Sequence, residues 1–476
     1  MTRFLHALGL VPAALAAVSV HEAVDRVENA LLPRYRVEGQ PPATLKLADQ
    51  MKRYGTPGIS VAVIRGGKIA WARGFGVQEA GSSKPVNRET VFQAASISKP
   101  VSALAALHMA QYGHFTLDED VNGKLKTWKV PENQFTSEKK VTLRELLSHS
   151  AGLTVHGFRG YADGEPVPTL PQLLDGAKPA NSAAIRVDVA PGSVFRYSGG
   201  GYSVMQQLLI DRMNRPFPEI MNMVVLRRLG MTRSTYEQPL PSAWHSDAAR
   251  AHRPDGSMVK GRWHTYPEMA AAGLWTTPTD LARFAIEVWK AARGESNKVI
   301  ERGMTEAMLT RQKGDYGLGL AITGEGAELT FGHGGSNQGY RCNLMMFRQS
   351  GDGIVVMTNG DLGDSLARMV ARTLSVLYGW PGRHQEVRKR ASVAPEVLKH
   401  YAGVYELGPG NRARITLEEG KLYAYPPQRP KAELVPESES SFFSFDEQVP
   451  PLEFVREGPG PARAVRLFGR EARRVE

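Results

Sequence analysis

The stretch QAASISKPVSALAALHMA, residues 93–110, decides how the rest of the chain is interpreted. It opens an apolar run with Ser96 three residues before Lys99. Residues three apart on a helix share one face, so this spacing can bring the hydroxyl and the amine together. Pro100 fits the first turn of a helix, where its missing N–H has no partner to lose. The stretch therefore predicts an apolar helix that begins at Ser96, with a lysine at its buried start.

A serine and a lysine in this arrangement can act as a nucleophile and its base. The positive end of a helix dipole would favour an oxyanion beside Ser96. Burial disfavours a charged amine, so Lys99 at the edge of a dry site could accept the hydroxyl proton. The pattern S-x-x-K also occurs at Ser137–Lys140 and Ser257–Lys260, but both lie in polar, turn-rich sequence. Taken alone, Ser96 is also consistent with an ordinary helix cap.

Two later segments add candidate residues. In PGSVFRYSGGGYSVMQQLL, Tyr197 lies on a glycine-flanked turn before a predicted helix. In LTFGHGGSNQGYRCNLMMF, His333 precedes Gly334 and Gly335 on a predicted strand, where missing side chains leave room for a substrate backbone. Each also has a structural interpretation, as a half-buried turn tyrosine or a hydrogen-bonded histidine. His149, in LLSHSAGL, is interpreted as structural.

The order of these motifs resembles the serine β-lactamase and DD-peptidase superfamily, in the AmpC-like branch that also contains D-aminopeptidases and family VIII esterases. SISK matches its first motif, YSG its Tyr-x-Asn motif in part, and HGG its Lys-Thr-Gly or His-x-Gly motif. LLSHSAGL and GLWTTPTDLARF are similar to recurrent segments of that branch. The resemblance covers roughly residues 40–380, and the C-terminal part resembles the lipocalin-like barrel that some members carry.

The resemblance implies a role for each matching residue. Ser96 would be the nucleophile, Lys99 the base that activates it, and Tyr197 the proton shuttle. The backbone N–H groups of Ser96 and Ser336 would form the oxyanion hole. Losing such a donor typically costs about 3 kcal/mol in the barrier.

On the strand, the resemblance implies that His333, Gly334 and Gly335 bind the substrate, and two departures from the family pattern matter. Gly199 stands where the tyrosine motif has Asn, so an amide that binds the acyl side chain or orients the lysine is missing. His333 replaces a lysine, and a part-time cation binds a β-lactam carboxylate less reliably than a fixed ammonium. Both count against an efficient β-lactamase and leave peptidase and esterase chemistry open.

The sequence therefore predicts a serine hydrolase that forms an acyl-enzyme with an ester or a peptide of the D-amino-acid type. The alternatives are a β-lactamase proper and a catalytically silent penicillin-binding or ligand-binding protein. Other chemistries lack their signatures, since the chain has no G-x-S-x-G elbow, no H-E-x-x-H and no G-x-x-x-x-G-K-[ST] motif. No cofactor and no metal are expected. Cys342 is the only cysteine, which excludes an intrachain disulfide and predicts a small core residue.

Apolar patterning predicts a fold of the α/β (α+β) class with two domains. Strand-like runs at both ends of residues 38–382, with helices between them, predict a mixed sheet flanked by helices, and the resemblance adds a helical subdomain. The charged segment 383–393 is expected to be a linker. Period-two alternation over 394–476 predicts a small antiparallel β-barrel, which we expect to pack near the cleft and restrict substrate size.

Composition and the N-terminus bear on partners and location. The net charge is +11 over 476 residues, but the excess is scattered and does not favour nucleic acid; attraction to an anionic cell wall or membrane is a further alternative. Residues 1–19 are expected to be a signal peptide of a periplasmic or secreted protein. No stable membrane span is predicted. The expected partner is a small-molecule or peptide substrate, with cell-wall peptide among the candidates, and the sequence does not indicate an oligomeric state.

Overall fold

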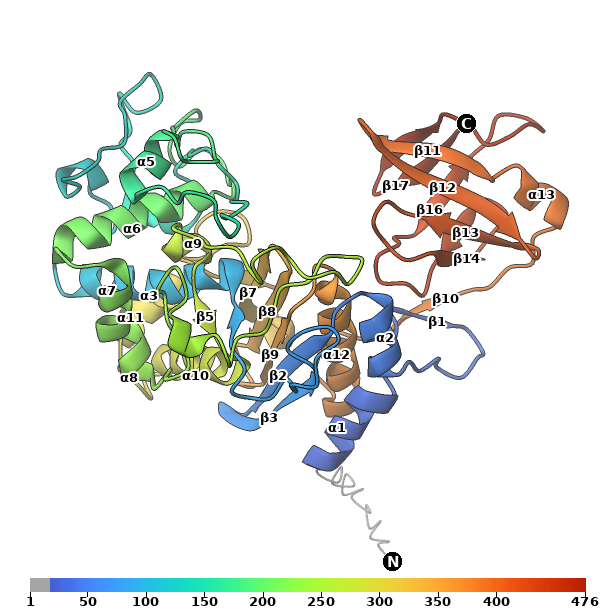
Figure 1. Ribbon diagram of the computed structural model, residues 1–476, viewed down its shortest axis with the longest axis horizontal. Helices are drawn as coiled ribbons and strands as arrows, with labels where there is room; N and C mark the ends of the chain where they lie inside the picture. Colours follow the sequence, from blue (N-terminus) through green and yellow to red (C-terminus); the bar gives the residue numbers. More distant parts are fainter. Residues whose placement is uncertain (1–17) are drawn as a thin grey trace, which may run out of the picture.

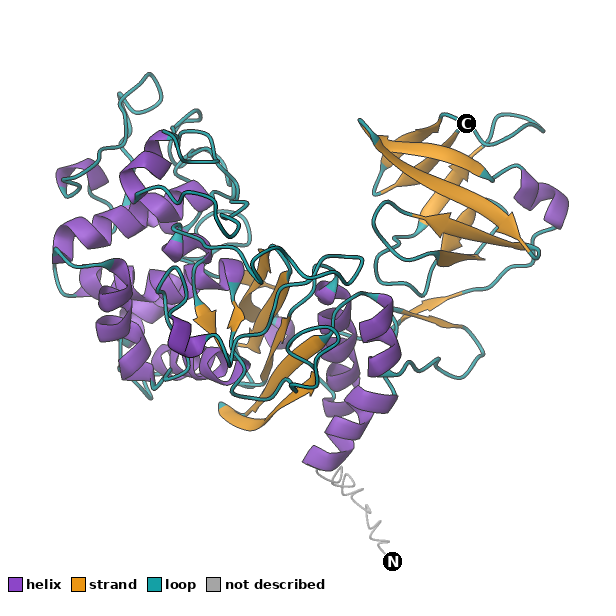
Figure 2. Ribbon diagram, viewed as in Figure 1, coloured by secondary structure: helices purple, strands orange, loops and turns teal. Residues whose placement is uncertain are grey.

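A six-stranded sheet forms the centre of the catalytic domain, in the strand order β3-β2-β9-β8-β7-β6 (Figures 1 and 2). The computed structural model describes residues 18–476, so most of the expected signal peptide lies outside the described residues. The strands are β2 (Gly58–Arg65), β3 (Lys68–Gly76), β6 (Ala321–Thr323), β7 (Thr330–Asn337), β8 (Tyr340–Phe347) and β9 (Gly353–Thr358). All five pairings are antiparallel, and β2 lies beside β9. This confirms the expected sheet built from both ends of the domain.

Helices cover both faces of this sheet, which explains why the central strands read as nearly continuous apolar runs. Along β2, Val61 and Val63 pack with the helices α1 (Val20–Asn29), α2 (Leu47–Arg53) and α12 (Gly363–Tyr378). Ala62 and Ile64 face the other way, into the core that contains α10 (Pro278–Ala292). Successive side chains of a strand point to opposite faces, so both sets are buried.

The core that contains α10 continues into the helical region, which is formed by the chain between β3 and β6 and lies beside the sheet (Figure 2). Its helices are α3 (Ser98–Gln111), α4 (Leu143–Leu147), α5 (Leu170–Asp175), α6 (Gly199–Met213), α7 (Phe217–Met221), α8 (Arg227–Leu229), α9 (Met269–Ala272) and α11 (Arg302–Met308). Two short strands, β4 (Phe92–Gln93) and β5 (Trp275–Thr276), pair beside them. The helix α3 is buried almost all round, as expected for a helix without a polar face.

The C-terminal domain is a closed antiparallel barrel, as predicted. Its strands are β11 (Gly403–Gly408), β12 (Asn411–Glu418), β13 (Lys421–Tyr425), β14 (Ala432–Pro436), β15 (Ser441–Phe443), β16 (Leu452–Val455), β17 (Ala464–Leu467) and β18 (Arg470–Arg474), preceded by the short helix α13 (Pro395–Lys399). Tyr401 stacks on Phe454 inside it, with ring centroids 4.2 Å apart. Closure leaves no unpaired edge strand, so a domain this small can be stable beside its neighbour.

The barrel docks on the helices that cover the sheet, away from the helical region (Figure 1). Within the expected linker, β10 (Glu386–Arg388) pairs in parallel with β1 (Tyr35–Val37). The side chain of Glu447 is 1% exposed and forms ion pairs with Arg368 and Arg372 of α12. Across residues 18–476, no helix is long and apolar enough to cross a bilayer.

Candidate active site

Ser96 and Lys99 meet as their spacing predicts. The Lys99 amine lies 3.0 Å from the Ser96 hydroxyl oxygen and donates a hydrogen bond to the Ala271 carbonyl at 2.9 Å. Lys99 is 2% exposed, whereas Ser96 is only partly buried. A solvent-accessible hydroxyl is thus held against an amine that water scarcely reaches.

The chain conformation before α3 differs slightly from the prediction. Ser96 lies in a 3₁₀ turn (Ala95–Ile97) that precedes the α-helix, rather than in its first turn. Ala95 adopts φ +50°, a left-handed conformation that L-residues with a side chain rarely adopt. The Ser98 hydroxyl donates to the Ala95 carbonyl and accepts from the Leu274 N–H. These bonds hold the sharp turn that presents the Ser96 side chain.

Tyr197 reaches the same point from the turn before α6. The centroid of its ring lies 5.0 Å from the Lys99 amine. The neighbouring residue, Ser198, caps α6 by accepting from the Gly201 N–H, which fixes where the helix begins. Among the described residues, the Tyr197 hydroxyl makes no hydrogen bond, so it is free to bond a substrate or water.

His149 holds this turn in place, a function that its sequence context alone did not reveal. Its carbonyl accepts from the Arg196 N–H at 2.7 Å, and its Nδ1 accepts from the Ser198 N–H at 3.1 Å. The residues on both sides of Tyr197 are therefore bonded to His149, whose ring packs 4.1 Å from the Tyr197 ring. Burial, and next the charge of Lys99, hold the pKa of His149 well below its ordinary value, so the imidazole is neutral.

The strand β7 forms the opposite wall. Its pairing with β6 ends at Gly332, so the following residues leave one strand edge uncovered by β6. A Cβ at Gly335 would lie 2.3 Å from the Ala94 carbonyl oxygen, so only glycine allows this close approach. This approach places β7 against the turn that contains Ser96. Gly334 is exposed, and a Cβ there would meet only the Cys342 carbonyl oxygen, at 3.9 Å.

His333 is a neutral group at the start of this uncovered edge. Its ring lies 6.1 Å from that of Tyr197. Burial, and next the charge of Lys99, lower the pKa of His333 to about 4. Its Nδ1 bonds the Gly334 carbonyl, which requires the proton on that nitrogen and leaves Nε2 as an acceptor. That Nε2 is buried and has no partner within residues 18–476.

The absence of the family's asparagine at Gly199 has a structural explanation. Gly199 is buried, and a Cβ there would lie 2.9 Å from the Phe158 ring and 3.2 Å from the His156 carbonyl oxygen. The space that an amide side chain would need is filled. The sequence shows the substitution, but only the packing shows that a larger residue would have to displace the Phe158 ring.

A buried carboxyl group lies just before α9, the helix whose carbonyls meet Lys99 and Ser102. Glu268 is fully buried, and neither of its carboxyl oxygens has a hydrogen-bond partner in the described part of the chain. Burial raises the pKa of Glu268 to about 8, so the group is mostly protonated at neutral pH. Sequence reasoning did not single it out, because an isolated glutamate carries no sequence signal.

No metal site accompanies these residues: the described chain holds no cluster of three or more histidine, cysteine, aspartate or glutamate side chains able to bind an ion. Cys342 pairs with Gly335 across β7 and β8, and burial raises the pKa of its thiol to about 12. It is therefore a core residue, as expected.

Comparison with known proteins fits this geometry. The family model described as Beta-lactamase matches residues 45–377. The chain belongs to this family. Membership places it among the serine hydrolases and confirms the resemblance noted from the motifs.

Two individual relatives of this chain share less than a third of its residues over the matched segments. Esterase EstB from Burkholderia gladioli is 28% identical over 183 residues, which cover 37% of this chain and 45% of that protein. Penicillin-binding protein 4* from Bacillus subtilis (strain 168) is 20% identical over 412 residues, 81% of this chain and 87% of that protein. The match with EstB thus spans less than half of that protein's length.

The fold is shared over most of the chain with the octameric penicillin-binding protein homologue from Pyrococcus abyssi. The TM-score is 0.62 at 22% sequence identity, and the alignment covers 87% of this chain and 95% of that one. This likeness concerns the fold and does not by itself assign a substrate.

Proposed function

We propose that the protein hydrolyses esters, or peptides of the D-amino-acid type, through an acyl-enzyme on Ser96. The observation that carries the proposal is the 3.0 Å contact between the Ser96 hydroxyl and the buried Lys99 amine. A serine hydroxyl is a weak nucleophile unless a neighbouring base takes its proton. The Lys99 nitrogen lies close enough to the Ser96 oxygen to take that proton.

In the proposed reaction, the Ser96 oxygen bonds to the substrate carbonyl carbon while its proton passes to Lys99. The N–H groups of Ser96 and Ser336 stabilise the oxyanion. The bond to the leaving group then breaks, and the leaving group takes a proton by way of Tyr197. Water attacks the resulting ester, and the same groups return the proton to Ser96.

The departures at Gly199 and His333 favour ester or peptide substrates over β-lactams. His333 is neutral at physiological pH, because burial and Lys99 lower its pKa to about 4. It therefore offers no positive charge to the carboxylate of a β-lactam. An ester that lacks such a carboxylate does not need a positive charge at His333.

The first test is covalent labelling of the purified protein. A fluorophosphonate or a fluorescent penicillin should label the native chain and fail to label Ser96→Ala, with intact mass spectrometry locating the adduct on the peptide that contains Ser96. If the native protein shows no adduct with either probe, the catalytically silent alternative is favoured and the proposal fails.

The second test separates the two enzymatic alternatives. Turnover of p-nitrophenyl esters with negligible turnover of nitrocefin is the expected result. Nitrocefin hydrolysis with the higher kcat/KM would instead assign a β-lactamase. Ser96→Ala is the control for both substrates and should abolish either activity.

A further inference from the structure

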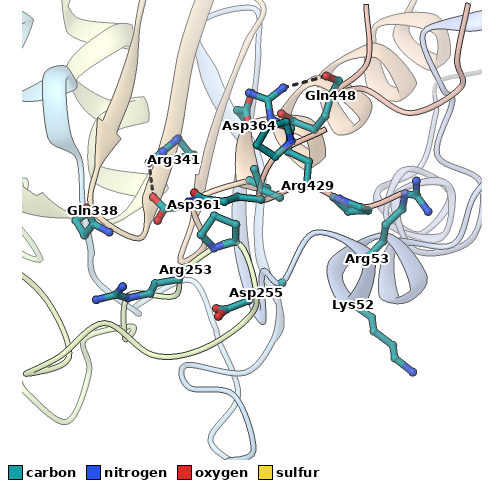
Figure 3. Close-up of a pocket in the computed structure, with 16 residues that line it drawn as sticks. Lys52, Arg53, Arg253, Asp255, Gln338, Arg341, Asp361, Asp364, Arg429 and Gln448 are labelled. Atoms are coloured by element: carbon teal, nitrogen blue, oxygen red, sulfur yellow. Dashed lines mark hydrogen bonds and ion pairs between the residues drawn. The ribbon is translucent and has the colours of Figure 1, made fainter. Parts of the chain in front are cut away.

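A large polar cavity lies where the barrel meets the catalytic domain (Figure 3). Its volume is about 1040 Å³. Its lining comes from α2, from the loop that carries Arg253, from the β7–β8 turn at Gln338, from the segment 361–364 that leads into α12, and from the barrel segment that carries Arg429. In Figure 3, Arg253 and Gln338 lie at one side of the cavity and Lys52 at the other.

The cavity carries an excess of uncompensated positive charge. Five basic and three acidic side chains line it. Arg53 and Arg341 are neutralised by carboxylates, at 2.5 Å and 3.0 Å. Lys52, Arg253 and Arg429, by contrast, form no ion pair with any residue in 18–476.

One lining carboxylate opposes this charge. Asp255 is exposed and bonds only the N–H and hydroxyl of Ser257. The unpaired groups are therefore three cations and one anion. An arrangement of this kind attracts a ligand with a negative charge.

Part of the cavity wall lies close in sequence to the candidate active site. Gln338, on its wall, is two residues after Ser336. Gln338 directly follows the last residue of β7, and two residues span at most about 7 Å, so a substrate that lies along β7 would reach the cavity wall within a short chain. The N–H of Gln338 donates to the Tyr266 hydroxyl, which holds this end of the strand.

The acyl part of the substrate, and not the leaving group, would extend along β7 toward the cavity. Tyr197 and Lys99, which supply the proton to the leaving group in the proposed function, lie near His333 at the other end of the uncovered edge. The leaving group therefore departs on the His333 side. The acyl chain runs in the opposite direction, past Ser336 toward Gln338.

We infer that this junction cavity receives a carboxylate at the far end of the substrate's acyl chain, and that Arg253 and Arg429 attract it. The inference rests on the proposed function and adds a substrate class: acyl groups that end in a negative charge. It also gives the barrel a part in substrate selection, because Arg429 belongs to the barrel.

The test compares p-nitrophenyl esters of sebacic acid whose far end is either a free carboxylate or a methyl ester. In the native protein kcat/KM should be about tenfold higher for the free carboxylate, since two unpaired cations contribute about threefold each. The preference should be absent with the shorter adipic acid esters. It should also shrink between about 0.02 M and 0.5 M salt, because ions screen exposed charges.

Variants assign the preference to the cavity. Arg253→Gln/Arg429→Gln should remove the preference while leaving turnover of the methyl-capped ester in place, and Asp255→Asn should increase it. Arg73→Gln is the matched control, since Arg73 is exposed on β3, outside the cavity lining, and should change nothing.

Two results would overturn the inference. If the native protein hydrolyses both sebacic esters equally, or if the double variant keeps the preference, the cavity does not bind the carboxylate. If neither ester is hydrolysed and no serine adduct forms, the proposed function itself has failed and the inference falls with it.

Discussion

Replacing Glu268 by glutamine should flatten the pH dependence of stability of the catalytic domain. Glu268 is fully buried, and its pKa rises from 4.5 to about 8 on folding. The folded state therefore keeps a proton that the unfolded chain releases between these two pH values. The contribution of this group to the free energy of unfolding has its full value below pH 4.5. It falls by about 1.4 kcal/mol per pH unit as the pH rises toward 8. Over the whole window the loss approaches about 5 kcal/mol.

Glutamine does not titrate, so the variant should lack this slope whatever the constant cost of the new amide. The assay is urea unfolding at about pH 5.5, 6.5 and 7.5, followed by tryptophan fluorescence. All seven tryptophans lie at or before Trp380, so the signal reports the catalytic domain and not the barrel. The free energy of unfolding of the native protein should fall relative to the variant by about 3 kcal/mol across this range.

The exposed Glu325 provides the control, since Glu325→Gln should leave the slope of the native protein unchanged. Parallel stability curves for the native protein and Glu268→Gln would refute the reasoning. They would mean that the carboxyl group titrates at the same pH in the folded and unfolded chains, and so that water or a partner reaches it.

Three further predictions concern the site and the domain junction. Gly335→Ala should lower kcat for ester hydrolysis by about a hundredfold, because the new Cβ would lie 2.3 Å from the Ala94 carbonyl oxygen and displace β7, which carries the proposed oxyanion donor Ser336. An unchanged kcat would contradict this close contact between β7 and Ala94. His149→Ala should lower kcat about tenfold with little change in KM, because the turn that carries the tyrosine loses the hydrogen bond from the Ser198 N–H to the imidazole; a change in KM alone would contradict this. Glu447→Gln should weaken the docking of the barrel, because it leaves the partly buried Arg372 without its carboxylate partner. Limited proteolysis between the domains should become about tenfold faster, and an unaltered cleavage rate would contradict this prediction.

Much of the site follows from local sequence. The three-residue spacing of Ser96 and Lys99 requires only one helical turn to bring the two groups together. The strand patterns were equally informative, because alternation and apolar runs follow directly from burial on one or both faces of a sheet. The C-terminal barrel is predictable for the same reason, from its period-two hydrophobic pattern.

Other features depend on parts of the chain that are far apart in sequence. His149 has the sequence context of an ordinary structural histidine, and its bonds to the turn at Tyr197 exist only after α4 and α6 have packed. The reason for Gly199 lies in the ring of Phe158, and no local pattern encodes that contact. Glu268 is a common residue whose pKa depends entirely on what surrounds it.

The amino-acid order alone therefore determined the elements, the two domains and the pairing of one hydroxyl with one amine, since each depends on interactions within a few residues. Tertiary packing decided which groups are dry, which are charged and which face a common cavity. Dielectric environment and close contact arise between distant segments, and the junction cavity with Arg253 and Arg429 exists only because the barrel docks where it does.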